Sequence, residues 1–264
     1  MPKVKLDIQE RLKGMVVIPA GSFERGSLDS PDEQPVKVVR LDSFAIDITP
    51  VTNKQFRLFI EEGGYKDHSF WTPQGWNFIT SNGIEYPNYW FDDHWNQDDC
   101  PVTGVSWWEA SAYAKFVAKA LPTEAQWEYA CKGKDNRKYP WGNERPTLEY
   151  ANFALECDPT DLNRSSTSVY HYPKNKSYFN CLDMAGNLAE WCLDKNSYNY
   201  EWDRLGNNPI YVTSKEKGKD YYIVRGGCGL HNEDFLRCTS RDYYPVSLRD
   251  NLVGFRCVIS NPYE

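Results

Sequence analysis

The sequence contains no long apolar run and no run of lysines and arginines. No window approaches the roughly 18 apolar residues that a membrane-spanning helix needs. The stretch from Met1 to Glu10 also lacks the apolar centre of a secretory signal. We therefore expect no membrane association and a cytoplasmic location; secretion would require a leader that has been removed.

Basic residues are in deficit. The chain has 30 Lys and Arg against 37 Asp and Glu, which gives a formal net charge of -7. A surface of this sign repels phosphate backbones, so we expect no nucleic-acid partner. An excess of carboxylates suits divalent cations better.

Closely paired cysteines are missing as well. The chain has eight cysteines, and none stands in a C-x-x-C pair. This pattern gives no support to a zinc ribbon or a thioredoxin-type site. Because no secretory signal is visible, we expect the thiols to be buried and reduced rather than paired in disulfides.

Aromatic residues, in contrast, are abundant, with 10 Trp, 18 Tyr and 12 Phe. Each large ring can bury about 150–250 Å² on folding. A sizeable core is therefore available, and mixed domains of about 250 residues are common. We expect a lead-in segment over residues 1–14 and a single domain over residues 15–264.

Three helices carry clear start signals. Thr52 can cap a helix that runs to about Glu62, and the pairs Ser106 with Glu109 and Thr123 with Gln126 form capping boxes. The third helix is short and ends near Gly133. The second is expected to run to Pro122 and to turn one face inward: Ala110, Tyr113, Ala114, Val117 and Leu121.

Short strands are expected over residues 15–19, 36–39, 44–48, 168–172, 190–194, 221–226, 235–241 and 253–259, with a turn around Phe23. Residues 65–104 show no clear period and read as a long insertion packed by its own rings. Two main helices, short twisted antiparallel strands and many long loops indicate an α+β fold.

Ten short motifs follow one another along the chain: Met15-Val16-Val17-Ile18-Pro19-Ala20-Gly21-Ser22-Phe23, Val51-Thr52-Asn53, Pro101-Val102-Thr103-Gly104-Val105-Ser106-Trp107, Leu121-Pro122-Thr123-Glu124-Ala125-Gln126-Trp127-Glu128-Tyr129-Ala130, Tyr139-Pro140-Trp141-Gly142-Asn143, Ala151-Asn152-Phe153, Asp183-Met184-Ala185-Gly186-Asn187, Glu190-Trp191, Arg225-Gly226-Gly227 and Gly254-Phe255-Arg256. In this order they resemble the formylglycine-generating enzyme, or sulfatase-modifying factor, family over roughly residues 15–260. The resemblance implies that family's variant of the C-type lectin fold. Its relatives include sulfoxide synthases, a pyoverdine-maturation enzyme, inactive paralogues and hypervariable ligand-binding proteins, so it indicates fold more sharply than function.

The resemblance also implies calcium as a cofactor, at two sites. The first would use the side chains of Asn152 and Asp161 with the carbonyls of Phe153 and Asn163. The second would use the side chains of Asp183 and Glu190 with the carbonyls of Gly186 and Leu188. Mixed carboxylate and carbonyl oxygens are the ligands calcium prefers. The alternative is that Asp183, Asn187 and Glu190 only cap turns.

The segment of this chain that corresponds to the family's catalytic segment departs from the family's pattern. Active members place a serine and then two copper-binding cysteines after Arg-Gly-Gly. This chain has Cys228 at the serine position, His231 at the first cysteine position, and Cys238 within the following strand. We therefore expect neither formylglycine generation nor a copper or iron cofactor. The three residues could still form a metal half-site or a Cys–His nucleophile pair. Alternatively, the thiols pack in the core and the histidine is solvated.

Aromatic side chains near charged residues in the sequence are candidates for ligand binding. The candidate residues are Trp76, Trp90, Arg241, Tyr243 and Tyr244. Alternatively, such rings fill the core of a loop-rich fold. Arg225 and Arg256 are interpreted as structural. Our leading hypothesis is a family member with altered or lost copper-oxidase chemistry, which binds a small-molecule ligand, peptide or protein partner in a groove lined by residues 228–250. The alternative is an oxidoreductase acting on a small amino-acid-derived substrate, although the iron-binding helical domain of the sulfoxide synthases is absent.

Overall fold

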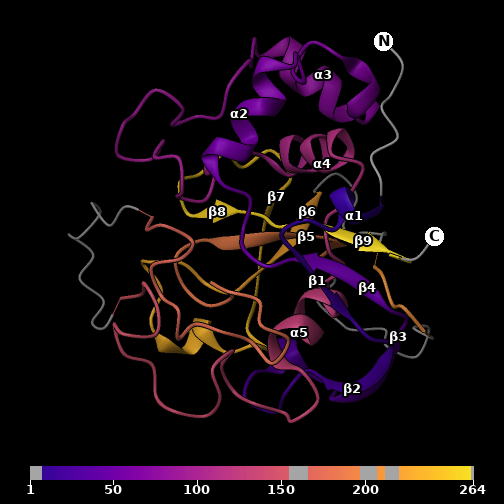
Figure 1. The fold of residues 1–264 in the computed structure, drawn as a ribbon, viewed down its shortest axis with the longest axis vertical. Helices are drawn as coiled ribbons and strands as arrows, with labels where there is room; N and C mark the ends of the chain where they lie inside the picture. Colours follow the sequence, from indigo (N-terminus) through magenta and orange to yellow (C-terminus); the bar gives the residue numbers. More distant parts are fainter. Residues whose placement is uncertain (1–7, 155–165, 197–206, 212–219, 263–264) are drawn as a thin grey trace.

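A computed structural model describes residues 8–154, 166–196, 207–211 and 220–262, which form small sheets, short helices and long loops (Figure 1). One antiparallel sheet has the order β1 (Met15–Ile18), β4 (Phe44–Asp47), β9 (Val258–Ser260), and a second pairs β2 (Gly21–Arg25) with β3 (Lys37–Leu41). A third has the order β7 (Arg241–Pro245), β6 (Tyr221–Arg225), β5 (Ala189–Lys195), β8 (Val253–Gly254), in which β8 runs parallel to β5.

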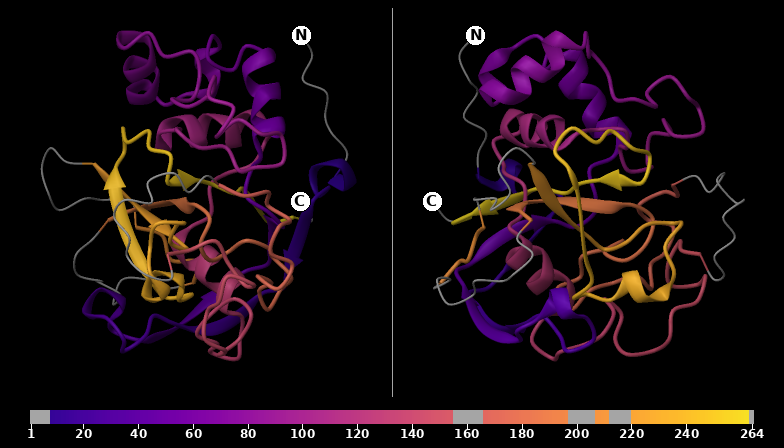
Figure 2. Two further views of the ribbon diagram at one scale, coloured as in Figure 1. Left: turned by 90° about the vertical axis from the view of Figure 1, so that its left-hand side faces the viewer. Right: turned by 180° about the vertical axis from the view of Figure 1, so that it is seen from behind.

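The helices lie at the two ends of the molecule, with the four-stranded sheet between them (Figures 1 and 2). At one end are α2 (Asn53–Glu61), α3 (Pro73–Ser81) and α4 (Trp107–Phe116). At the other, α5 (Glu124–Lys132) packs against β2, β3, β5 and β6. The remaining helical turns are α1 (Ile8–Arg11) and the 3-10 turns η1 (Pro31–Glu33), η2 (His68–Phe70) and η4 (Glu233–Leu236).

The helix starts predicted from capping signals are confirmed. Thr52, Ser106 and Thr123 each accept a backbone N–H in the first turn, and the glutamine or glutamate three residues later returns the bond. Gly133 ends α5 with a positive φ of 71°. Each box satisfies two backbone donors that would otherwise be orphaned.

Helix α4 is shorter than predicted. It ends at Phe116, because Ala118 turns into the left-handed region (φ 55°) and the N–H of Lys119 reaches back to the carbonyl of Ala114 at 2.8 Å. This closing pattern caps the last carbonyls of the helix. Ala120 then bridges to Val258, so Leu121 enters the core from an extended segment.

The insertion contains a helix that was not predicted. Thr72 caps α3 by accepting the N–H of Gly75 at 3.1 Å, and Pro73 occupies the first helical position. Phe78 of this helix packs on Trp108, with ring centroids 4.8 Å apart. Elsewhere the insertion packs partly through its own rings, as between Tyr65 and Trp71, and partly against Phe56 and Phe59 of α2 in the first core.

Three predicted strand assignments were wrong. Residues 168–172 form a turn, residues 235–241 hold the end of η4 before β7 begins, and residues 253–259 divide into β8 and β9. Between β8 and β9, the carbonyl of Phe255 accepts the N–H of Val51, and the carbonyl of Cys257 accepts the N–H of Asp47 at the end of β4. Conversely, the expected turn around Phe23 is strand β2.

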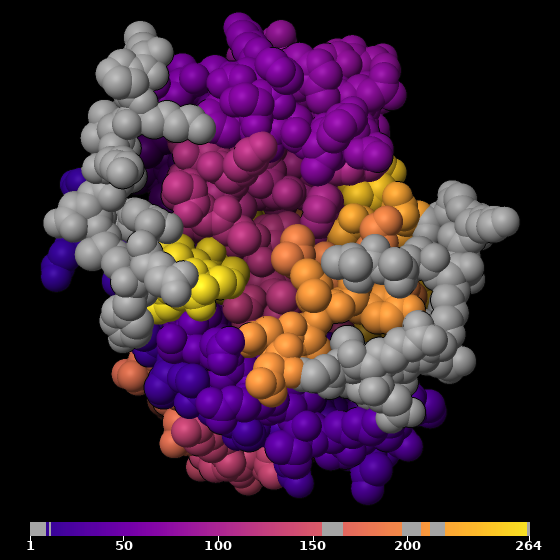
Figure 3. Space-filling view, turned by 90° about the vertical axis from the view of Figure 1, so that its right-hand side faces the viewer, coloured from indigo at the N-terminus to yellow at the C-terminus, as the bar shows by residue number. Residues whose placement is uncertain are grey.

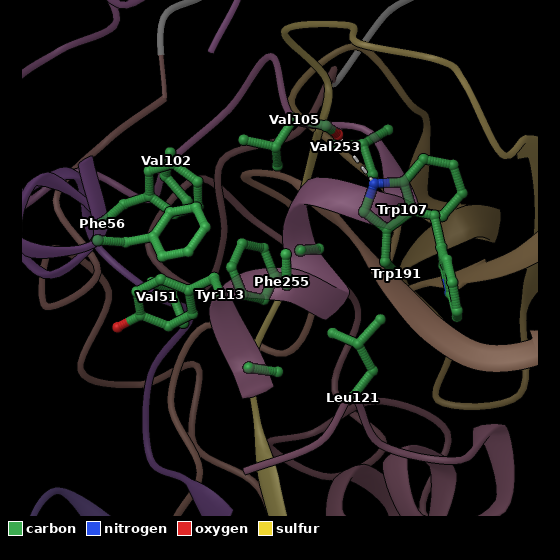
Figure 4. Packing of buried hydrophobic residues seen from close by; sticks show 14 of the residues in the cluster. Val51, Phe56, Val102, Val105, Trp107, Tyr113, Leu121, Trp191, Val253 and Phe255 are labelled. Atoms are coloured by element: carbon green, nitrogen blue, oxygen red, sulfur yellow. Dashed lines mark hydrogen bonds between the residues drawn. The ribbon is translucent and has the colours of Figure 1, made fainter. Parts of the chain in front are cut away.

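Two main hydrophobic cores lie on opposite faces of the β5–β6 pair. Trp191 and Val224 belong to the first core. Figure 4 shows Trp191 in this core with Phe56 and Tyr113 of the helical end. In Figure 4, Trp191 Nε1 donates to the carbonyl of Val105 at 3.1 Å. The neighbouring side chains of Cys192 and Ile223 belong to the second core, which α5 covers. This alternation follows from the two-residue period of a strand.

The α+β fold class is therefore confirmed. Among the described residues, no helix is both long and apolar enough to cross a bilayer.

Candidate functional site

The Arg225-Gly226-Gly227 segment ends β6 and sets the course of the chain into the candidate site. Arg225 is buried, and it donates to Glu128 Oε2 at 2.5 Å and to the carbonyls of Thr239 and Cys238 at 2.7 and 3.1 Å. Gly227 has φ +67°, and a Cβ there would lie 2.9 Å from the carbonyl oxygen of Phe235. The structural role predicted for Arg225 is confirmed.

Cys228 is fully buried where the family's serine would stand. Burial raises the pKa of its thiol to about 11, and the negative charges of Asp250 and Asp242 oppose ionisation further, against two backbone hydrogen bonds that favour it. The thiolate is the nucleophilic and metal-binding form of cysteine. Cys228 is therefore a neutral thiol at pH 7, not an activated one.

His231 turns back toward its own segment. Its Nδ1 accepts the backbone N–H of Cys228 at 3.3 Å, and its ring stacks on Phe235 with centroids 4.2 Å apart. Burial lowers the pKa of His231, although Asp242 acts in the opposite direction. A nitrogen that accepts a hydrogen bond carries no proton, so the imidazole is neutral.

Cys238 belongs to a different part of the molecule. It lies in the second core, where its sulfur is 2.8 Å from that of Cys131 on α5. The structure thus brings Cys228 and His231 together but places Cys238 elsewhere. The seven cysteines of the described residues are all buried and free of disulfides, and Cys157 lies outside those residues.

Two carboxylates that sequence reasoning missed act electrostatically on Cys228. Asp242 hydrogen-bonds the hydroxyl of Tyr244, and Asp242 and Asp250 both act electrostatically on Tyr244 and on the Cys228 thiol. The two-residue period of a strand could have placed Asp242 in the site, because Asp242 and Tyr244 stand two residues apart on β7 and so share a face. Cys228, His231, Asp242 and Tyr244 form the candidate site, bordered by Asp250.

The other predicted ligand-binding residues divide between the two cores. Arg241 and Tyr243 occupy the opposite face of β7: Arg241 Nη2 donates to Glu124 Oε2 at 2.9 Å, and Tyr243 packs on the second core. Trp90 is buried in the first core, and Trp76 packs partly against it. Of the five residues proposed, only Tyr244 lies beside Cys228.

The residues proposed for the second calcium site lie close together. Asp183 and Glu190 are buried, and the Arg256 guanidinium donates to Glu190 Oε2 at 2.6 Å and Oε1 at 2.7 Å. Burial raises the pKa of Asp183 to about 7, although Asn187 and Arg256 pull it down. One arginine therefore faces two buried carboxylates, so one negative charge is uncompensated when Asp183 is ionised.

The same segment carries two backbone carbonyls named in the calcium prediction. Within the described residues, no backbone hydrogen bond reaches the carbonyl of Gly186 or Leu188. Gly186 lets its segment lie close to the backbone of Asn152, because a Cβ at position 186 would lie 2.3 Å from the carbonyl oxygen of Asn152. The carboxylate and carbonyl oxygens of this segment are of the kind that a hard cation such as calcium prefers.

The first proposed calcium site is only partly described. Asn152 and Phe153 are buried, and the Asn152 carbonyl accepts the N–H of Asn187 at 2.8 Å. Asp161 and Asn163 lie outside the described residues.

A separate cavity of about 320 Å³ opens on the face drawn in Figure 3. Figure 3 shows the yellow C-terminal region and the orange segment on either side of this hollow. Its lining is mixed polar and apolar: Leu41, Asp42, Thr123, Gln126, Asn208 and Ile210 are among the residues. None of the lining residues belongs to the candidate site.

Comparison with known proteins shows which family the chain belongs to. The sulfatase-modifying factor enzyme 1-like domain matches residues 2–261. This chain belongs to that family. The sulfatase-modifying factor domain thus extends over nearly the whole chain, including the candidate site and both proposed calcium sites.

Similar proteins carry different names. The chain is 35% identical to the serine/threonine-protein kinase pkn1 of Chlamydia caviae, over 92% of this chain but 37% of that protein. It is 32% identical to the hercynine oxygenase of Mycolicibacterium smegmatis, over 88% of this chain and 58% of that protein. It is 30% identical to the formylglycine-generating enzyme of Thermomonospora curvata, over 97% and 98% of the two chains. The chain thus spans about a third of the first of these proteins.

A solved structure supports the family's fold. The chain resembles PvdO from Pseudomonas aeruginosa with a TM-score of 0.67 and 21% identity, over 92% of this chain and 93% of that chain. The sequence prediction of a formylglycine-generating-enzyme-like fold is confirmed.

Proposed function

We propose that this sulfatase-modifying factor domain has lost or altered the copper-oxidase chemistry of its family and binds a ligand, peptide or protein partner through residues 228–250. The observation that carries the proposal is the state of Cys228 and His231. The thiol is buried and neutral, with its ionisation opposed by the charges of Asp250 and Asp242, and the imidazole accepts the N–H of Cys228 through Nδ1. Neither residue presents a thiolate for Cu(I), which prefers soft sulfur ligands.

The half-buried side chains around this pair support the binding role. His231, Asp242, Tyr244 and Asp250 combine ring surface with polar groups, and all four are partly exposed. Side chains of this kind give contact area and directional hydrogen bonds with few rotatable bonds.

Calcium is proposed as a structural cofactor. Asp183 and Glu190, with the carbonyls of Gly186 and Leu188, would hold the ion at the second site. The uncompensated charge at Asp183 and Glu190 supports this assignment. The ion would offset that charge and join the segment before β5 to the core.

The second candidate function is an oxidoreductase acting on a small amino-acid-derived substrate. The observation that favours it is the 32% identity with a hercynine oxygenase over 88% of this chain. Under this alternative, His231 and Asp242 would be the candidates for proton transfer to or from a substrate, because they are the imidazole and the carboxylate of the candidate site.

Elemental analysis of the purified protein separates the two candidates. The binding proposal predicts bound calcium, with copper and iron each far below one atom per chain. Copper or iron near one atom per chain, reduced in both His231→Ala and Asp242→Asn but retained in the exposed-site control Asp93→Asn, would overturn it. Calorimetric titration of the same protein samples then measures their calcium affinity.

A further inference from the structure

A long stretch of the helical end has no positive charge. From Asp67 to Ala114 the sequence contains no lysine or arginine, but seven aspartates and glutamates. Five of these seven lie in residues 85–99, the loop between α3 and α4 that we call the acidic arm. The arm extends outward from the helical end of the molecule (Figures 1 and 2).

The acidic arm is held firmly at its base. Asn53 Nδ2 donates to the carbonyls of Trp95 and Gln97 at 2.8 and 2.9 Å. Asn88 Nδ2 donates to the backbone carbonyl of Arg249, and Asn88 Oδ1 accepts from Arg249 Nη1, both at 2.6 Å. The buried rings of Trp90 and Trp95 anchor the loop from inside. Its outer residues are therefore presented from a structured base, which lowers the ordering cost of binding a partner.

An aromatic pair stands exposed on this arm. Phe91 is 80% exposed and Tyr86 39% exposed, and their rings meet edge to face with centroids 5.0 Å apart. Phe91 is the most exposed of the large hydrophobic side chains in the described residues. Exposed aromatic surface on a structured loop is typical of an interaction site.

Carboxylates without basic partners surround the two rings. Glu85, Asp92 and Asp93 are exposed, and no lysine or arginine of the described residues forms an ion pair with any of them. The two arginines at the base of the arm pair with other carboxylates: Arg57 with Asp98 at 2.6 Å and Arg249 with Glu109 at 2.8 Å. The outer surface of the arm is thus aromatic and negative.

We propose that the acidic arm is a docking surface for an arginine- or lysine-bearing segment of another polypeptide. Arginine side chains stack on aromatic faces and pair with carboxylates, so one segment could use both features at once. A second copy of this chain is a poor fit, because two chains of net charge -7 repel each other. The surface lies outside residues 228–250, so the inference does not depend on the proposed function.

The test uses fluorescein-labelled peptides of defined sequence and the full chain. A (Gly-Arg)₆ peptide is expected to bind in fluorescence anisotropy, whereas (Gly-Ser)₆ and (Gly-Asp)₆ peptides are not. Phe91→Ser is expected to weaken binding about tenfold. The double variant Glu85→Gln with Asp93→Asn is expected to weaken it roughly three- to tenfold and to reduce its salt dependence.

Matched controls lie away from the arm. Leu28→Ser removes an apolar side chain that is 78% exposed, and Glu10→Gln neutralises an exposed carboxylate on α1. Both controls are expected to bind (Gly-Arg)₆ like the wild type. Binding that is absent, or that falls equally in the controls, overturns the proposal. A wild-type dimer in sedimentation that Phe91→Ser dissociates would also overturn it, by assigning the surface to a second copy.

Discussion

At the scale of single residues, the candidate site depends on where the chain places Cys228. Burial disfavours the charged form of the thiol, and the negative charges of two carboxylates from later segments disfavour it further. His231 does not counter this, because its Nδ1 already accepts a backbone N–H. The pair thus has the residue types of a nucleophile and a base without their working geometry.

Cys228 is therefore expected to resist alkylation. At pH 8 a thiol with a pKa of about 11 holds roughly a hundredfold less thiolate than an ordinary cysteine. Native protein treated with iodoacetamide and digested for mass spectrometry should show Cys228 unmodified long after an unfolded sample has reacted completely. His231→Ala should stay equally slow. Rapid native labelling that depends on His231 would reveal an activated thiol and contradict the assignment.

The sequence identified Cys228 and His231 as neighbours but not the groups around them. Asp250 reaches the site from a loop 22 positions later, and only folding makes it a neighbour. Cys238 was grouped with them by closeness in sequence, yet η4 and the following turn carry it into the other core beside Cys131. Short separation along a chain does not ensure contact when a turn lies between.

At the scale of elements, α5 joins three sheet segments through its first turn. Glu124 is buried, and it accepts from Arg25 Nη2 at 2.6 Å and Arg241 Nη2 at 2.9 Å, while Arg225 lies 3.5 Å away. These arginines belong to β2, β7 and β6. Burial would raise the pKa of Glu124, but Arg241, Arg25 and Arg225 outweigh it and lower the pKa to about 2.

Replacing Glu124 with Gln is expected to destabilise the fold by about 3–5 kcal/mol, because it leaves buried arginines without their carboxylate. The folded pKa lies below the ordinary value of 4.5, so the stabilisation is present above that pH and is lost as the pH falls toward 2. Urea unfolding across pH 3–7 measures both effects, with Glu10→Gln as the exposed control. A Glu124→Gln variant as stable as the control at pH 7 would contradict this reading.

Helix starts were predictable because capping is local chemistry. Thr52, Ser106 and Thr123 each stand three residues before a glutamine or glutamate, and all three begin helices. The end of α4 was not predictable, because the long-range bridge from Ala120 to Val258 draws the chain out of the helix. Helix α3 was missed although Thr72 and Pro73 mark its start, since the surrounding aromatics hid any period.

At the scale of the whole molecule, the sheet around β5 and β6 carries both the candidate site and the proposed calcium site. Asp183 and Glu190 precede and enter β5, and Arg225 ends β6 beside Glu190. The ordered motifs predicted this framework well, because they lie at its turns and buried ion pairs. They could not indicate function, since the family's fold is shared by proteins with different names.

Calcium removal is expected to destabilise the whole domain. An ion that binds only the folded state adds about 4 kcal/mol at a thousandfold excess over its dissociation constant, so chelation should lower the Tm by several degrees. Differential scanning fluorimetry with and without EGTA measures the change. Asp183→Asn should remove the response, and the exposed Asp93→Asn should keep it. An unchanged wild-type melt after chelation would exclude a stabilising calcium ion.

The most direct test of the account concerns the chemistry that the family name implies. The protein is incubated with Cu(I), oxygen, a reductant and a peptide containing Cys-x-Pro-x-Arg, and the peptide mass is then measured. With Cys228 neutral and His231 in place of a thiolate, the account predicts no aldehyde above the control without protein. Aldehyde formation above that control, abolished in His231→Ala, would contradict it and establish this chain as an oxidase.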